Sequence, residues 1–423
     1  MSGLLDLVLR RALVAGQDGP PVDIGIRGGL IAALATRIDS DGRVEDLAGR
    51  LVLPGFVESH VHLDKSCLLD RVGNAASLPL AIAEVAAAKR DFTVEDVYAR
   101  GRRTLEKAIA QGTTRMRTHV EADPRIGLRS FEAVLQLKRD YAWAIDLQIC
   151  IFPQEGLLND PGTDELLVAA VAGGADLVGG CPYTDTNPNG QIARIFDIAE
   201  ANGIDVDFHL DFHLDPTRAD LPEVCRQTRA RGMGGHVAVG HVSTLSAMAS
   251  SAAERSAEMM AEAGVALTVL PATDLFLMGR GHDHLTPRGV APAHRFAGHG
   301  VTCAISTNNV LNPFTPFGDC SMIRMANLYA NIAQLGTLPE MANCFDMVTA
   351  APARLMNLAD YGIEIGNPAD LVILDATEPG MAVAELAQVL TVYRRGRRTV
   401  SRPAAQIHAP GDGTLAQTSD AVR

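Results

Sequence analysis

Eight short apolar runs, most of them separated by helix-like stretches, are the feature that most restricts the fold of this 423-residue chain. Many of the runs place a His, Gln or Asn at their carboxyl end. A repeated order of strand and helix predicts parallel strands joined by helical crossovers. The fold class we expect is therefore α/β, with a (β/α)8 TIM barrel built from LVLPGFVESH, TTRMRTHVEA, IDLQICIFPQ, ADLVGGCPY, IDVDFHLD, HVAVGHVS, VALTVLP and VTCAISTNN.

Both ends of the chain carry strand-like sequence outside these runs. Residues Leu4–Val14 and Asp23–Ile38 alternate in polarity around turn signals, and ADLVILD and VLTVYRRGRRTVS follow late in the chain. Such stretches predict short strands and hairpins. We expect one small β-sandwich domain made from residues 1–50 and 360–403, a barrel over 51–359, and a polar tail over 404–423.

The charge balance excludes two classes of partner. The chain has 37 Lys and Arg against 50 Asp and Glu, a net charge of −13, and no basic run. We therefore expect no nucleic acid and no membrane partner. The amino terminus lacks the order of a signal peptide, and no long uncharged apolar window predicts a transmembrane helix.

The cysteines indicate the compartment. All seven are scattered, and none forms a CxxC pair, which is typical of free thiols in the cytoplasm. We expect a cytoplasmic protein that forms a homo-oligomer.

Histidines end three of the predicted strands. His60 and His62 stand two residues apart, so in a strand their side chains project from the same face. Taken alone, this pair also fits two ordinary polar residues. His209 and His241 end two later runs at the same level of the barrel, where active sites of such barrels lie. Four converging imidazoles predict a divalent metal site for zinc, iron, manganese or cobalt.

Five motifs in order resemble those of the amidohydrolase superfamily, and most closely its cytosine deaminase-like branch: GFVESHVHLDK, DLQICIFPQEG, FHLDFHLDP, VGHVSTL and NNVLNPFTPFGD. The resemblance spans nearly the whole chain. It implies that His60, His62 and His209 ligate the metal, and that His241 contacts the attacking water. It also implies that Gln154 reads a cyclic amide edge of the substrate; the alternative is a loop amide that holds its own backbone.

Two positions depart from the pattern of this branch. Phe212 stands where the pattern has an acid that shuttles protons, and Asn308 stands where it has a metal-binding Asp that acts as base. An Asn amide coordinates weakly and is no base near neutral pH. Either the proton transfer has moved to neighbours, above all His213, or the chain has kept binding and lost hydrolysis. We retain His241, His213 and Asn308 as catalytic candidates and Asn308 as a weak fourth ligand.

Three further sites each allow a functional and a structural interpretation. Lys65 either carries a bridging carbamate or acts as an ammonium beside the site, and we favour the ammonium. His119 either lines the substrate pocket or makes a structural hydrogen bond. His282 and His284 repeat the HxH pattern in a Gly-rich loop, which we interpret as a substrate cover without metal.

These observations predict a metal-dependent amidohydrolase that hydrolyses a C–N bond of a small nitrogen heterocycle. Deamination of a cytosine-like pyrimidine or a triazine is the expected reaction. The alternatives are a cyclic-amide ring-opening hydrolase and a catalytically impaired homologue that only binds its ligand.

Overall fold

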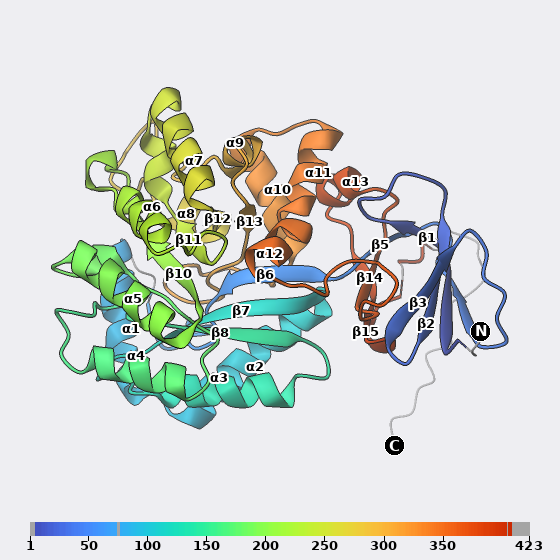
Figure 1. The fold of residues 1–423 in the computed structure, drawn as a ribbon, viewed down its shortest axis with the longest axis horizontal. Coiled ribbons are helices and arrows are strands. Elements are labelled where there is room, and N and C mark those ends of the chain that lie inside the picture. The colour runs from blue at the N-terminus through green and yellow to red at the C-terminus, as the bar shows by residue number, and fades with distance from the viewer. Residues whose placement is uncertain (1–4, 74–76, 404, 408–423) are drawn as a thin grey trace, which may run out of the picture.

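The protein is described by a computed structural model that covers residues 5–73, 77–403 and 405–407. The predicted tail over 404–423 lies, apart from 405–407, outside the described residues. The described chain forms a large barrel and a smaller sheet beside it (Figure 1).

Eight parallel strands form the barrel in the order of the sequence. A bridge between Val61 and Asn308 joins the first strand to the segment after the last, and the His62 backbone N donates to the Asn308 carbonyl at 2.9 Å. The ring is therefore closed, and the predicted (β/α)8 barrel is confirmed. Its strands are β6 (Phe56–Val61), β7 (Thr113–Glu121), β8 (Asp146–Phe152), β9 (Leu177–Val178), β10 (Asp205–Leu210), β11 (Val237–His241), β12 (Val265–Val269) and β13 (Cys303–Ile305).

Helices surround the barrel (Figure 1). In α2, for example, the Thr93 side chain caps the first turn by accepting from the Asp96 N–H, and Val97 and Leu105 bury one face of the helix. No helix within the described ranges has the length and hydropathy that crossing a bilayer requires. The helices are α1 (Leu78–Ala88), α2 (Val94–Ala110), α3 (Arg129–Asp140), α4 (Thr163–Ala172), α5 (Pro188–Asn202), α6 (Leu221–Ala230), α7 (Ser250–Ala263), α8 (Pro271–Leu277), α9 (Ala293–Gly298), α10 (Met322–Ala333), α11 (Leu338–Asp346), α12 (Ala350–Leu355) and α13 (Pro379–Ala384).

The small sheet brings the two chain ends together, as predicted. Its strand order is β16-β15-β14-β5-β1-β2-β3, and β4 pairs with β1. The bounds are β1 (Leu7–Val14), β2 (Val22–Arg27), β3 (Leu30–Ala35), β4 (Arg43–Asp46), β5 (Leu51–Leu53), β14 (Leu371–Leu374), β15 (Val389–Arg394) and β16 (Arg397–Ser401). Because β5 pairs with β1 and β14, residues 51–53 belong to this sheet rather than to the barrel, where we had placed them.

Ion pairs connect the small sheet to the amino-terminal ends of the barrel strands. Arg115 of β7 lies 2.7 Å from Asp370, which precedes β14, and 3.1 Å from Asp146 of β8. Arg394 of β15 pairs with the same two carboxylates. The small sheet therefore covers the bottom of the barrel, and the opposite, carboxyl ends of the strands are left for the site.

Candidate active site

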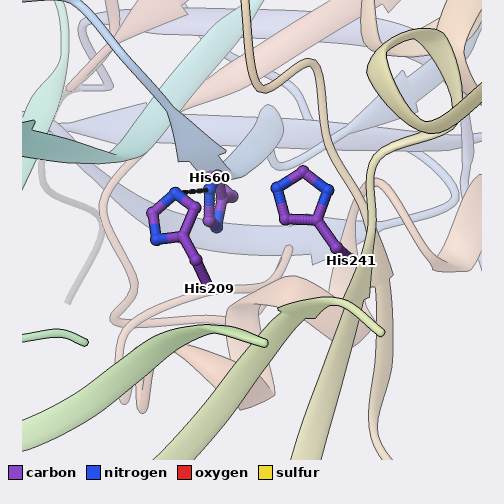
Figure 2. A group of neighbouring side chains, drawn as sticks. All are labelled: His60, His209 and His241. Atoms are coloured by element: carbon purple, nitrogen blue, oxygen red, sulfur yellow. Dashed lines mark hydrogen bonds between the residues drawn. The ribbon is translucent and has the colours of Figure 1, made fainter. Parts of the chain in front are cut away.

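The four predicted histidines meet at the carboxyl ends of three barrel strands. His60 lies in β6 and His62 directly after it. His209 and His241 come from β10 and β11, and Figure 2 shows these two with His60. All four side chains are buried. A Cβ at Gly240 of β11 would lie 3.0 Å from the His60 ring, so any larger residue there would press on that ring.

The ring nitrogens of three of these residues converge. The Nε2 atoms of His60 and His62 lie 3.1 and 3.0 Å from Nε2 of His209. His62 Nδ1 lies 3.2 Å from the His119 carbonyl, to which it donates, so in the neutral ring its Nε2 carries a lone pair. Burial, above all, holds the pKa of each of the three imidazoles well below its usual value. They are therefore neutral, which is the form that binds a metal.

These residues fit a divalent cation. His60, His209 and His241 each offer one ligand atom within 4.8 Å of the others. The Oδ1 atom of Asn308, beside the converging Nε2 atoms, is buried and has no hydrogen-bond partner. Neutral imidazoles that face one another at about 3 Å are favourable only when a cation, or a shared proton, lies between their lone pairs.

Asn308 lies beside this cluster with its backbone in the left-handed region, at a φ of 61°, which Asn tolerates better than most residues. Its Nδ2 atom lies 3.5 Å from His241 Nε2. The structure therefore brings Asn308 to the predicted place in the site.

His241 is held by a carboxylate that the sequence analysis did not single out. Its Nδ1 atom lies 2.6 Å from Oδ1 of Asp274 in α8, and both side chains are buried. Burial raises the pKa of the Asp274 carboxyl, and the neighbouring His241 opposes that rise. The available signal was an acid shortly after the seventh strand, in the run LPATD, at the catalytic end of the barrel.

Phe212 occupies the place expected for the proton shuttle. Its ring stacks on the ring of His241, with the centroids 3.8 Å apart and the planes inclined by 25°. Its side chain is buried. The group in contact with His241 on this side is therefore apolar.

Lys65 and Gln154 form a polar group on the other side. The Lys65 ammonium donates to Glu121 at 2.7 Å and to Oε1 of Gln154 at 3.0 Å. The salt bridge with Glu121 supports the ammonium reading of Lys65 over the carbamate. Gln154 also donates from Nε2 to Cys181 at 3.4 Å, so each end of its amide has one partner.

Two predicted residues lie away from the cavity. His119 is fully buried beneath the cluster, where its ring stacks on His60 with the centroids 3.7 Å apart. His213 follows the end of β10, and its Nδ1 accepts a hydrogen bond from the Asp215 N–H at 3.3 Å. His119 does not line the cavity, and neither of its ring nitrogens makes a hydrogen bond, although Nε2 lies 3.6 Å from the buried carboxylate of Asp207. The structure does not bring His213 to the cluster.

Two other groups of ligand-type side chains hold no comparable site. His284 in the Gly-rich loop is exposed and pairs with the adjacent Asp283. The buried acids Glu121 and Asp123 and the half-buried Glu155 are grouped around the Lys89 ammonium, which lies 2.6 to 2.8 Å from each of them. That cluster already contains its own cation.

The small cavity at the carboxyl ends of the strands combines these features. It is lined by ten residues: His62, Lys65, Gln154, Tyr183, His209, Phe212, His241, Asn308, Asn309 and Phe314. Its walls thus present imidazoles at one place, amides at another and three aromatic rings.

The sequence pattern of the Amidohydrolase family matches residues 43–134 and 104–400. The chain is 28% identical to N-isopropylammelide isopropyl amidohydrolase of Pseudomonas sp. (strain ADP), over 94% of this chain and 98% of that protein. It is also 28% identical to pterin deaminase of Rhizobium rhizogenes, over 91% and 90%. Among solved structures, 5-methylcytosine deaminase of Klebsiella pneumoniae, liganded with 5-fluorocytosine, superposes with a TM-score of 0.90 at 28% identity, over 95% of this chain and 99% of that one.

The chain therefore belongs to the amidohydrolase family. Within it, the chain belongs to the cytosine deaminase-like branch, as its motifs indicated. The expectation of a hydrolase that acts on carbon–nitrogen bonds other than peptide bonds is thereby confirmed.

Proposed function

We propose that this chain binds one divalent metal and hydrolyses a C–N bond of a small nitrogen heterocycle, by deamination of a cytosine-like pyrimidine or a triazine. The observation that carries the proposal is the convergence of the Nε2 atoms of His60 and His62 on that of His209. Asn308 completes this set as a weak fourth ligand. Zinc, iron and manganese all suit nitrogen ligands of this kind.

A divalent metal in such a set supplies Lewis acidity and lowers the pKa of the attacking water from about 15.7 toward about 7. His241 presents Nε2 to the cavity while Asp274 holds its Nδ1–H. It is therefore the residue that stabilises the charge developing on the substrate and moves the proton. Because Phe212 cannot transfer a proton, we assign the proton transfer to His241.

Gln154 orients the ring of the substrate. Its Oε1 accepts one hydrogen bond from Lys65, which leaves a second lone pair, and its Nε2 donates to Cys181 with the Tyr183 hydroxyl as its other neighbour. A side chain fixed in this way offers an acceptor to the substrate. That acceptor matches the N–H of a cyclic amide.

A second candidate function rests on the same two departures. Phe212 against His241, and an amide at 308, remove both acids that the resemblance leads us to expect. A homologue that binds a heterocycle and hydrolyses it poorly would have this site. A ring-opening hydrolase of cyclic amides is the third candidate, and it would release no ammonia.

A cytoplasmic location and a homo-oligomeric state remain predictions. The location is supported by the seven cysteines, all of them buried and none in a disulfide. Size-exclusion chromatography with light scattering tests the oligomer.

An ammonia-release screen tests the proposed reaction. The protein loaded with zinc, iron or manganese is incubated with aminopyrimidines, aminotriazines and cyclic ureas. Ammonia from an amino-substituted ring supports deamination. Loss of a cyclic substrate without ammonia supports ring opening, and no turnover of any substrate supports the impaired homologue.

A further inference from the structure

The lining of the cavity contains no carboxylate. Among its ten residues, Lys65 is the one with a permanent charge, and the others are imidazoles, amides and aromatic rings. The two places where the resemblance leads us to expect acids are occupied by Phe212 and Asn308. A metal bound there would be held by neutral ligands, and its two positive charges would face the cavity uncompensated.

Acids do lie behind this lining: Asp64 is 4.0 Å from Nδ1 of His62, and Asp207 pairs with Arg117 at 2.8 Å. The two whose carboxylates hydrogen-bond to side chains of the lining are already paired. Glu121 accepts from both Lys65 and Lys89, at 2.7 and 2.8 Å. Asp274 is bonded to Nδ1 of His241, on the side of the ring away from Nε2. Each of these carboxylates is therefore turned toward its own partner and does not supply an anionic contact within the cavity.

Lys65 adds positive charge at the wall. Two of the three N–H groups of its ammonium are used by Glu121 and Gln154, and the third remains for a ligand. The ammonium also lies 4.6 Å from the centre of the Phe314 ring, which is one of the aromatic walls. A flat ring placed in this cavity would therefore lie within reach of an ammonium, a metal and a fixed amide.

From this charge distribution we propose that the site selects a planar heterocycle that carries a negative charge, such as an oxo-pyrimidine or oxo-triazine with an ionised ring N–H. This inference rests on the proposed function, because it concerns the ligand of the same pocket. An anion replaces the missing carboxylate as the partner of the metal, whereas a neutral aminopyrimidine leaves that charge uncompensated.

The test compares two rings of nearly the same shape. Isothermal titration calorimetry at pH 7 measures binding of barbiturate, which is an anion there, and of uracil, which is neutral, to the zinc-loaded protein. We expect barbiturate to bind at least ten-fold more tightly, and uracil to bind more tightly as the pH is raised toward the pKa of uracil itself. Equal affinities, or tighter binding of uracil, would overturn the inference.

Matched variants separate charge from shape. Asn308→Asp and Phe212→Glu each place an acid in the lining, and each should reduce the preference for barbiturate at least ten-fold. Phe212→Leu changes its position without charge and should keep the preference. Metal analysis and thermal melting confirm that each variant is loaded and folded. A preference that survives both acidic variants in loaded, folded protein would contradict the proposal.

The two proposals fail in different ways. Tight binding of barbiturate without ammonia from any heterocycle would support the anionic ligand and contradict deamination. Ammonia release from cytosine without a preference for barbiturate would support deamination and contradict the anionic ligand.

Discussion

His241 and Asp274 form a buried pair in which Nδ1 of the imidazole lies 2.6 Å from Oδ1 of the carboxylate. The backbone of His241 is in the left-handed region, at a φ of 70°, which is rare for a residue with a side chain. Asp274 also accepts from the Leu270 N–H at 3.2 Å. The pair therefore fixes both the direction and the tautomer of the one imidazole on which Phe212 stacks.

Asp274→Asn should impair proton transfer more than substrate binding. The Asn amide can present a donor to Nδ1 and so favours the wrong tautomer of His241. We expect kcat to fall about 100-fold, with KM changed little and the pH profile altered. Steady-state kinetics measure this, and Asp283→Asn in the exposed loop serves as the control. A purely structural role would lower thermal stability and leave the pH profile of the folded variant unchanged.

Asn308→Asp should tighten metal binding, since a carboxylate is an anionic ligand. Combined with Phe212→Glu it restores both expected acids, and deamination of cytosine by the double variant should exceed that of either single variant. Competition with a chromogenic chelator measures the metal, and ammonia release measures the reaction. If the double variant shows neither tighter metal binding nor faster deamination, positions 308 and 212 do not correspond to the two acids of the branch that the chain resembles.

His119 should act on the metal through His60. Its ring stacks on His60, and its carbonyl accepts from His62, so it supports two ligands at once. We expect His119→Ala to weaken metal binding by about 10 to 100-fold, while His119→Phe keeps the stacked ring and most of the affinity. Equal losses in the two variants would show that stacking is not the cause.

Glu121 should stabilise the fold in a manner that depends on pH. Burial alone would raise its pKa, but the Lys65 and Lys89 ammoniums lower it to about 2, below the ordinary value of 4.5. A carboxyl with a lowered pKa stabilises the folded state above about pH 4.5, and this contribution disappears as the pH falls toward 2. Glu121→Gln should therefore cost about 3 kcal/mol at pH 7.

Urea denaturation of the wild-type and Glu121→Gln proteins measures this difference. It should shrink as the pH falls from about 4.5 toward 2. Glu223→Gln, which breaks an exposed ion pair with Arg226, is the control and should cost less than about 1 kcal/mol. A difference for Glu121→Gln that does not change with pH would exclude the ionic origin.

Much of the architecture followed from the sequence because periodicity and strand-end position are local properties. The sequence predicted the eight barrel strands. It also predicted that four histidines meet, because residues at the carboxyl ends of parallel barrel strands lie at the same end of the barrel: His60, His62, His209 and His241. The small sheet followed from the strand-like ends. The boundary between the small sheet and the barrel could not be predicted, because β5 pairs with strands that are distant in the sequence.

The partners of the site could not be predicted in the same way. The link between His241 and Asp274 depends on how α8 begins after β12, and the grouping of Lys65, Lys89 and Glu121 joins segments far apart in the chain. His213 illustrates the limit of periodicity. Strand β10 ends at Leu210, and Asp211 turns the chain with a φ of 47°, so the alternation does not continue to His213.

Metal analysis of the dialysed protein tests most directly whether the imidazole cluster is a metal centre. After loading with zinc, iron or manganese and exhaustive dialysis, we predict close to one metal ion per chain in the wild-type protein. We predict almost none in His60→Ala, and an unchanged content in the His282→Ala control. A wild-type protein that retains no metal, or a folded His60→Ala variant that retains a full equivalent, would contradict the assignment of this cluster.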